Sequence, residues 1–414
     1  MLPRRRSWSV ETPSVAHPTV LAYRQHVHTA DRAVRHPIGA AITTEELEAD
    51  LHGVLARLRS AEPVSWVPAL GGWLVTTRDL VVDMMRDAER FTVDDPRFST
   101  GQVLGPSMLS LDGAEHSRHR QPFADAFRPP EVRHRYAEAV EQSARQRVAG
   151  LTPHGRAELR RELAGPLAVD VMELTLQLVG TETATLLGWY DDIVAATTAI
   201  ADGALGAERP TAVQHLAERV RLTVQAGDGV LAEAARTLTV DEVVSNTGVM
   251  LFGGLETSEG ATTNALLLLL STPGALEAVR EDPSLVGNAV DESLRLEPSV
   301  VRLDRYATQD VEVAGARISA GEFVMLSLAA ANRDPKVFDD PDVFDVRRSN
   351  ARQHVTFAHG PHLCPGMHLA RVETEAGVRA ALEAWPQLRL DPDHPVPMPT
   401  GTIFRKPEAL RVRW

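Results

Sequence analysis

The sequence predicts a mainly α fold with a small β part, built as one large domain. Three observations support this prediction. Helical patterns dominate the chain, strand-like patterns are confined to two short regions, and no long linker rich in Pro, Gly or Ser divides the 414 residues. The first forty residues are polar and irregular, with scattered His, Arg and Pro. We therefore expect an irregular N-terminal arm over residues 1–44 and a single domain over residues 45–414.

The first strand-like region covers residues 64–77, where VSWVP and WLVTT flank Gly71-Gly72 and predict a hairpin. The second covers residues 310–328, where VEVAGARI and EFVMLSL are separated by turn residues. Helical patterns predict helices over residues 79–88, 116–127, 131–150, 157–180 and 184–202.

One predicted helix is much longer than the others. Thr239 and Glu242 form a capping box at its start, and Pro273 follows its last periodic residue. The helix should span ~48 Å, enough to cross a whole domain. Gly253 and Gly254 lie in its middle and cost roughly 2 kcal/mol relative to alanines. We expect either a close approach to the backbone, a local opening, or a kink at a packing contact.

Composition and charge exclude several classes of protein. The 43 basic and 56 acidic residues give a formal charge of −13, which argues against a nucleic-acid partner. The longest aliphatic run, residues 265–270, is far below the ~20 residues that span a bilayer. The N-terminus has arginines but no following apolar run, and one cysteine cannot form a disulfide within the chain. We expect a cytoplasmic protein without a membrane anchor.

The only cysteine, Cys364, lies directly before a predicted helix, in a loop rich in Gly, Pro and His. Backbone N–H groups and the helix dipole are expected to lower its pKa and favour a metal-ligating thiolate. A buried free cysteine is the simpler interpretation. A zinc site with His354, His359 and His362 is a third possibility, although this short loop is cramped for four ligands.

Two other pairs of residues could share a helix face. Glu292 and Arg295 are spaced i, i+3, and His116 and Arg120 are spaced i, i+4. In isolation, either pair would more often be a solvated surface contact.

Four motifs in order resemble the cytochrome P-450 superfamily of heme-thiolate monooxygenases, specifically its soluble bacterial members. Phe357-x-x-Gly360-x-His362-x-Cys364-x-Gly366 is similar to the heme-binding loop, and Glu292-x-x-Arg295 matches the ExxR helix. The segment from Gly253 to Thr257 resembles the oxygen-activating part of the long central helix, and residues 332–348 are similar to the stretch before the cysteine loop. The resemblance covers residues 60–414.

The resemblance implies a cytochrome P-450 fold in which the long central helix crosses over heme b (iron protoporphyrin IX). Cys364 would be the axial iron ligand, and Phe357 would shield its sulfur. Gly360 and Gly366 would let the loop pass close to the porphyrin, and Gly253 and Gly254 would leave room for O2. Arg348 would join the structural salt bridge of Glu292 and Arg295. The heme propionates would be held by His116, Arg120, Arg305 and His362.

Proton delivery is assigned by the same resemblance to Glu256 and Thr257. Thr257 would donate a hydrogen bond towards the oxygen and hold a water, and Glu256 would resupply the proton. The resemblance further implies that O2 is used to hydroxylate or epoxidise a substrate.

The substrate pocket is expected to include parts of residues 92–110 and 180–215. The expected pocket segments carry mainly aliphatic side chains, which favour a mid-sized, fairly apolar substrate such as a natural-product intermediate. The expected pocket residues are Leu251, Leu255, Val300, Val301, Thr402, Ile403 and Phe404.

Other activities remain open. The same scaffold could catalyse oxidative coupling or ring closure without net oxygen insertion, whereas a peroxide-driven enzyme could dispense with the acid–alcohol pair. From other classes, the chain could be a heme-binding sensor without turnover or a zinc-binding structural protein.

The chain contains no flavin or iron–sulfur motif, so electrons from NAD(P)H would arrive through a separate ferredoxin and ferredoxin reductase. A basic patch could dock an acidic ferredoxin, although an ordinary solvated helix face is an equal alternative. We expect a monomer. The patch would comprise Arg118, His119, Arg128, Arg133 and Arg135.

Two positions depart from the family pattern. Pro365 follows Cys364 and has no N–H to donate to the sulfur, so we expect a more electron-rich thiolate and a lower reduction potential. Ala358 stands where the family often has Gly or Ser, which we take as a mild change.

Overall fold

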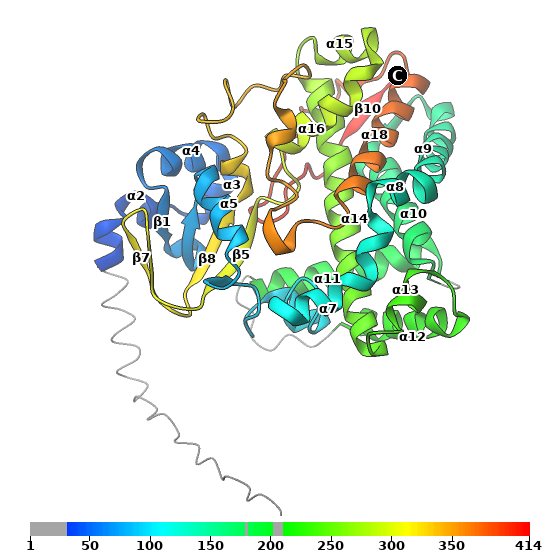
Figure 1. Cartoon of the computed structure of the whole chain (residues 1–414). Coiled ribbons are helices and arrows are strands. Elements are labelled where there is room, and N and C mark those ends of the chain that lie inside the picture. Colours follow the sequence, from blue (N-terminus) through cyan, green and yellow to red (C-terminus); the bar gives the residue numbers. More distant parts are fainter. Residues whose placement is uncertain (1–30, 179–180, 202–209) are drawn as a thin grey trace, which may run out of the picture.

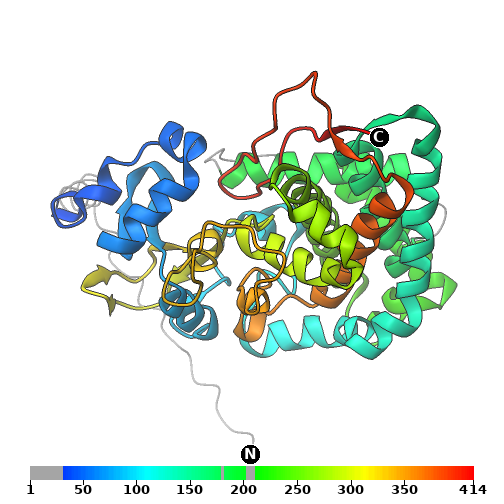
Figure 2. The ribbon, with the colours of Figure 1, turned by 90° about the horizontal axis from the view of Figure 1, so that it is seen from above.

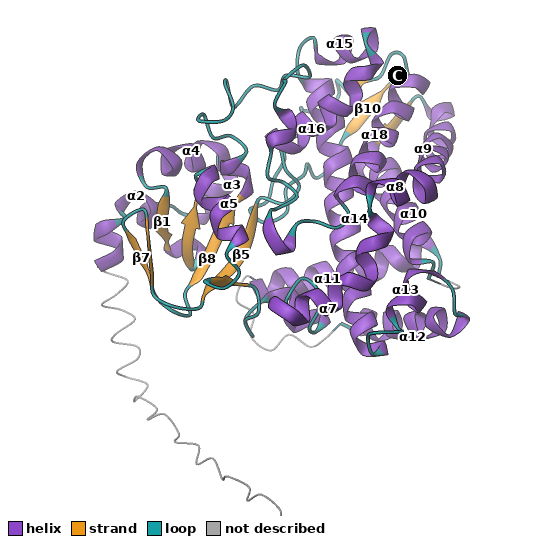
Figure 3. Cartoon of the chain, viewed as in Figure 1, coloured by secondary structure: helices purple, strands orange, loops and turns teal. Residues whose placement is uncertain are grey.

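The computed structural model describes residues 31–178, 181–201 and 210–414. Strands gather in a smaller region beside a larger helical region, as the strand and helix colours make clear (Figure 1, Figure 3). Seen from above, segments around residue 350 lie between the two regions (Figure 2). The mainly α fold with a small β part is therefore confirmed.

The main sheet has five strands in the order β1-β2-β8-β5-β3. Strands β1 and β2 pair antiparallel as a hairpin, as the sequence predicts, while β2 and β8 are parallel. Two small sheets have the orders β4-β10-β9 and β6-β7. The strands are β1 (Val64–Val67), β2 (Gly72–Val75), β3 (Phe91–Thr92), β4 (Arg156–Glu158), β5 (Arg302–Ala307), β6 (Val311–Val313), β7 (Ala316–Ile318), β8 (Phe323–Ser327), β9 (Arg389–Leu390) and β10 (Arg411–Arg413).

The helices form most of the described chain and enclose the largest apolar core. They are α2 (Pro37–Ala41), α3 (Thr44–Ala49), α4 (Leu51–Ala61), α5 (Arg78–Arg86), α6 (Ser99–Leu104), α7 (Gly113–Ala124), α8 (Pro129–Glu131), α9 (Ala137–Leu151), α10 (Gly165–Leu176), α11 (Thr183–Ala201), α12 (Thr211–Ala226), α13 (Gly229–Ala234), α14 (Val240–Ser271), α15 (Ala275–Glu281), α16 (Val286–Leu296), α17 (Leu328–Ala331) and α18 (Met367–Ala384).

Helix α14 is the axis of the helical region, and α10, α12, α16 and α18 pack against it (Figure 1). Its 32 residues begin after Thr239, whose hydroxyl accepts a hydrogen bond from Glu242 N, and the reciprocal bond completes the capping box. The helix remains α-helical through Gly253 and Gly254. The long helix and its cap are therefore as predicted, and the glycines do not open it.

Two predicted boundaries are wrong. Of the helix expected over residues 157–180, residues 157 and 158 belong to β4, residues 160–164 form a π-helical turn, and α10 covers Gly165–Leu176. Strand β4 pairs with β10, more than 250 residues later, so its short local pattern could not reveal it. Residues 31–35, α2 and the start of α3 are helical, although they belong to the stretch expected to be irregular. Residues 1–30 of that expected arm lie outside the described residues.

None of the helices in the described part of the chain is both long and apolar enough to span a bilayer.

Candidate active site

A cavity of about 350 Å³ lies between α14, β5 and the loop before α18. Its wall is mostly apolar and is completed by Ser299 and Val300 just before β5, by the start of α6 and by the C-terminal segment at Ile403 and Phe404. Predicted site residues on the wall are Arg120, Gly253, Gly254, Thr257, Val300, Phe357, His362, Cys364, Gly366, Ile403 and Phe404. The fold thus brings half of the predicted site residues to one cavity.

The loop before α18 presents Cys364 to this cavity. Cys364 N donates a hydrogen bond to Phe357 O at 2.8 Å, which closes the loop behind the sulfur. Gly360 has φ +74°, and a Cβ there would lie 2.7 Å from Met85 O at the end of α5. The absent side chain of Gly360 therefore serves this approach to α5, whereas a Cβ at Gly366 would make only an ordinary contact with Cys364 Sγ at 3.9 Å.

Cys364 is half-buried where it lines the cavity. Burial raises the pKa of Cys364, and hydrogen bonds from the backbone of Gly366 and Met367 only partly oppose this effect. The expectation that the helix N-terminus lowers this pKa is therefore wrong for the free thiol, because desolvation outweighs the dipole. A cation bound at the sulfur would reverse the balance.

Ala358, in the same loop, adopts φ +63°. This left-handed conformation is strained for a residue with a Cβ. The replacement of Gly by Ala is therefore less mild than we expected.

The middle of α14 forms the opposite wall. Gly253 leaves open space, since a Cβ there would meet no atom within 4 Å, whereas a Cβ at Gly254 would lie 2.3 Å from Met172 Sδ. Only Gly253 therefore keeps room in the cavity, and Gly254 permits the close approach of α10. Thr257 Oγ1 donates to Gly253 O at 2.5 Å.

Glu256 does not line the cavity. Its Oε1 lies 2.7 Å from Lys406 Nζ, and Lys406 also pairs with Glu259. The side chain expected to resupply Thr257 with protons is thus directed to the C-terminal segment. Sequence reasoning could not foresee this partner, which is 150 residues away in the chain.

A different carboxyl group does line the cavity, and no motif in the sequence singles it out. Glu373 on α18 is 2% exposed, and its Oε1 has no hydrogen-bond partner. Burial raises the pKa of Glu373 to about 8, while a hydrogen bond with Ser258 opposes this only partly. Because Ser258 follows Thr257 on α14, a neutral carboxyl group lies next to the predicted relay.

Four predicted propionate-binding residues group at one edge of the site with Asp112. The rings of His116 and His362 are 4.4 Å apart, and His362 Nε2 lies 2.8 Å from Asp112 Oδ1. Arg305 Nη1 donates to Asp304 O at 2.7 Å. Arg120 Nη2 donates to Leu363 O.

This group contains an unsatisfied donor or acceptor. His116 is 5% exposed, and its Nε2 has no hydrogen-bond partner. Burial, together with the nearby His362 and Arg120, lowers the pKa of His116 to about 4. Burial also lowers the pKa of Arg305 to about 10. Both shifts come mainly from burial, and Asp112 is the carboxylate of this group that acts on both residues.

The Glu292–Arg295 pair is fully buried. Arg295 donates Nε and Nη2 to the two carboxylate oxygens of Glu292 at 2.7 and 2.9 Å, and its Nη1 donates to Asn332 O and Pro341 O. Arg348 Nε donates to Glu292 Oε1 at 2.9 Å. The three side chains therefore tie α16 to the stretch before the cysteine loop.

Comparison with known proteins agrees with this arrangement. The family model described as cytochrome P450 matches residues 228–413. Nocardicin C N-oxygenase from Nocardia uniformis subsp. tsuyamanensis is 34% identical over 387 residues, which cover 88% of this chain and 96% of that protein. The cytochrome P450 monooxygenase PikC from Streptomyces venezuelae is 33% identical, covering 89% and 92%. The chain belongs to the cytochrome P450 family.

A solved structure of P450BioI, in complex with an acyl carrier protein ligated to hexadec-9Z-enoic acid, superposes on this P450 with a TM-score of 0.80. It is 27% identical and covers 90% of this chain and 100% of its own. The family consists of heme-containing monooxygenases, so this P450 is an oxidoreductase.

The residues of this P450 fit a heme. The thiol of Cys364 faces the cavity, Gly253 leaves open space across from it, and the orphaned Nε2 of His116 lies in a cationic cluster suited to carboxylates. By contrast, no group of three His, Cys, Asp or Glu within residues 31–178, 181–201 and 210–414 is arranged to hold a metal ion. His354, a suggested zinc ligand, instead lies 3.5 Å from Asp291.

Several predicted pocket residues face elsewhere. Leu251 and Leu255 pack into the helical core, and Val301 packs against α4. Thr402 is also absent from the cavity wall within the described residues, although Ile403 and Phe404 lie on it. Period and composition could not tell which face of α14 meets the cavity, and the leucines occupy the opposite face from Gly253.

The predicted basic patch is largely neutralised. Arg118 pairs with Glu115 and Glu242, and His119 is buried beside Asn246. The remaining pairs are Arg128 with Asp125 and Arg135 with Glu131. Of the five residues, only Arg133 has no ion-pair partner among the described side chains.

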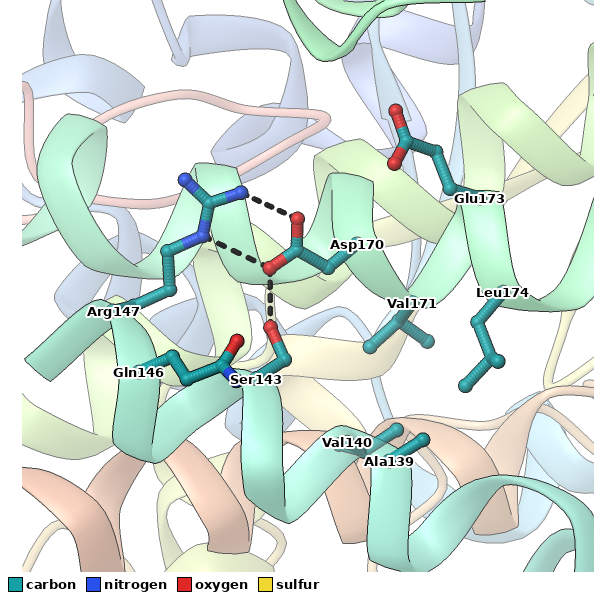
Figure 4. Close-up of a pocket in the computed structure, with 9 residues that line it drawn as sticks. All are labelled: Ala139, Val140, Ser143, Gln146, Arg147, Asp170, Val171, Glu173 and Leu174. Atoms are coloured by element: carbon teal, nitrogen blue, oxygen red, sulfur yellow. Dashed lines mark hydrogen bonds and ion pairs between the residues drawn. The ribbon is translucent and has the colours of Figure 1, made fainter. Parts of the chain in front are cut away.

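A second, open hollow of about 540 Å³ lies between α9 and α10 (Figure 4). Asp170 accepts hydrogen bonds from Arg147, with Nε at 2.9 Å, and from Ser143. Glu173 stands apart from this group and accepts a hydrogen bond from Thr183 at 3.2 Å. Because Arg147 and Asp170 satisfy each other, the hollow shows no sign of a catalytic site.

Proposed function

We propose that this P450 uses O2 and a heme b ligated by Cys364 to hydroxylate or epoxidise a mid-sized, fairly apolar molecule. The observation that supports this most is the position of Cys364 on the wall of a mostly apolar cavity opposite Gly253. A thiolate-ligated heme supplies O2 activation when it is bound. The residues of the chain must then hold the heme, move protons and place the substrate.

The cationic cluster would hold the heme carboxylates. His116, Arg120, Arg305 and His362 provide N–H donors, and hydrogen bonds between charged groups are the strongest in a buried setting. The orphaned Nε2 of His116 would gain a partner, which removes the cost of leaving a buried polar atom unsatisfied. The ExxR group of Glu292, Arg295 and Arg348 would keep the cysteine loop in place without touching the heme.

Thr257 would pass protons from its hydroxyl towards the oxygen. Its present bond to Gly253 O occupies the hydroxyl hydrogen, so donation requires a change of rotamer or of partner. Glu256, held by Lys406, can act only after that pair opens. We retain Glu256 as a supply of protons and Thr257 as the group that delivers them.

Electrons would come from NAD(P)H through a separate ferredoxin and ferredoxin reductase. The neutralised basic patch weakens the docking site that we expected, and only Arg133 remains free there for an acidic partner. Oxidation of a natural product is supported by the relatives named above, since one is a nocardicin C N-oxygenase. Oxidative coupling without net oxygen insertion is the second candidate on the same site.

Reconstitution with a ferredoxin, its reductase, NADPH and O2 tests this function. The wild type should consume O2 and form oxidised product, and Thr257→Ala should divert most of the consumed O2 to hydrogen peroxide. Thr257→Ser retains the hydroxyl and is the matched control, which should stay coupled. Heme binding without NADPH-dependent O2 consumption would indicate a sensor and contradict the proposal.

A further inference from the structure

Two residues that line the cavity have buried polar atoms for which no described residue provides a hydrogen bond. Ser299 and Arg302 both line it, in the short stretch between α16 and the start of β5. Ser299 Oγ, Arg302 Nε and Arg302 Nη1 have no hydrogen-bond partner, and the Arg302 side chain is 9% exposed. Their Cα atoms can be at most about 10 Å apart, because they are three residue steps apart along the chain.

Arg302 does not belong to the cluster assigned to the heme carboxylates. Side chains alternate between the two faces of a strand, so Arg302 and Arg305 on β5 point to opposite faces. Arg305 interacts with Asp112 beside His362, whereas Arg302 faces no member of that cluster in any contact of the structure. Arg302 is therefore separate from the residues that we assign to the heme carboxylates.

Asp304 balances the charge of Arg302 only in part. Its Oδ1 lies 3.6 Å from Arg302 Nε, beyond hydrogen-bond distance, and its side chain is 24% exposed. Burial raises the pKa of Asp304, and the nearby Arg302 and Arg305 oppose this shift. A buried guanidinium with unused donors is costly, so the site favours a ligand that fills them.

We propose that the substrate of this P450 carries a carboxylate that binds Arg302, with the Ser299 hydroxyl as a second donor. The inference rests on the proposed function, because it concerns the substrate of the same cavity. A planar carboxylate matches the fork of donors on a guanidinium. The remaining wall is mostly apolar, so the rest of the substrate is a hydrocarbon or aromatic body. An alcohol or amide would leave the charge of Arg302 unbalanced.

Ligands with a fixed anchor test this inference on the heme-loaded enzyme. An imidazole bound to the iron shifts the heme absorbance, so ω-(imidazol-1-yl)alkanoates from butanoate to dodecanoate can be titrated against the alcohols of equal length. We expect at least one length at which the acid binds roughly 10- to 100-fold more tightly than the alcohol. Arg302→Gln should abolish that preference. Arg317→Gln, at an exposed side chain of β7, is the control and should retain it.

A second substitution tests the inference even if the Arg302→Gln variant fails to fold. Asp304→Asn removes the competing carboxylate and should tighten the binding of acids several-fold while leaving alcohols unchanged. The inference is overturned if no chain length favours the acid, or if either substitution leaves the ratio of acid to alcohol affinities unchanged. Loss of the imidazole-induced shift in the wild type would instead overturn the proposed heme site.

Discussion

The ExxR group and the cavity wall both bury charged residues. Only in the ExxR group do these buried side chains have their hydrogen-bond partners among the described residues. Around Glu292, each guanidinium nitrogen of Arg295 has a partner within 3.1 Å, and Arg348 fills a further position on the same carboxylate. Around the cavity, His116 Nε2, Arg302 Nε and Glu373 Oε1 have none. Buried polar groups normally have hydrogen-bond partners. We therefore interpret the ExxR group as part of the scaffold and the residues around the cavity as a site for molecules that bind there.

The largest loss of stability should come from a substitution in the ExxR group. Glu292→Gln leaves Arg295 and Arg348 buried with too little negative charge, which should cost about 3–5 kcal/mol. Because whole proteins have only about 5–15 kcal/mol of stability, little folded protein should be recovered. The yield and the urea midpoint measure this, with Arg302→Gln as the comparison. A midpoint for Glu292→Gln equal to that of Arg302→Gln would contradict the contrast.

Glu373 offers the next test, through pH. Burial raises the pKa of Glu373 from 4.5 to about 8 in the folded protein, so folding favours its protonated form. That stabilisation is complete below pH 4.5 and is lost as pH rises through about 8, at up to about 1.4 kcal/mol per pH unit. The stability of the Glu373→Gln variant relative to the wild type should therefore increase as pH rises from about 5 to 8. Urea midpoints that keep a constant difference across this range would refute the assignment.

The two glycines of α14 allow a smaller, matched comparison. Gly254→Ala should destabilise by about 1–3 kcal/mol, because its Cβ overlaps Met172 Sδ. Gly253→Ala meets open space and should gain up to about 1 kcal/mol from helix propensity. Gly253→Ala should also narrow the cavity and weaken ligand binding. The thermal midpoint should fall for Gly254→Ala and rise for Gly253→Ala. Equal changes of the midpoint in the two variants would contradict this prediction.

The smallest effect should come from Ala358. Since this residue has φ +63°, Ala358→Gly should relieve strain and stabilise the protein by about 1 kcal/mol. A rise of the thermal midpoint is the expected result, and a fall would show that the side chain of Ala358 contributes more by packing than it costs in strain.

Local sequence was enough to predict those features that depend on neighbours along the chain. The capping box of Thr239 and Glu242 and the i, i+3 pair of Glu292 and Arg295 are set by spacing alone. The family resemblance predicted Cys364 as a site residue, and the loop that carries Cys364 lines the cavity.

Features that depend on distant partners could not be predicted. The direction of Glu256 is decided by Lys406, and the face on which Leu251 lies is decided by the helices around α14. The partial charge balance of Arg302 depends on the position of Asp304 on β5, which forms one wall of the cavity.

The central claim is that Cys364 ligates heme iron in this cavity. The absorption spectrum of the reduced, CO-bound protein tests it most directly, with Cys364→Ser as the partner variant. The wild type should show the strongly red-shifted main band of a thiolate-ligated heme, and the serine variant should lose it. A wild type without that band, or a serine variant with an unchanged one, would contradict the claim.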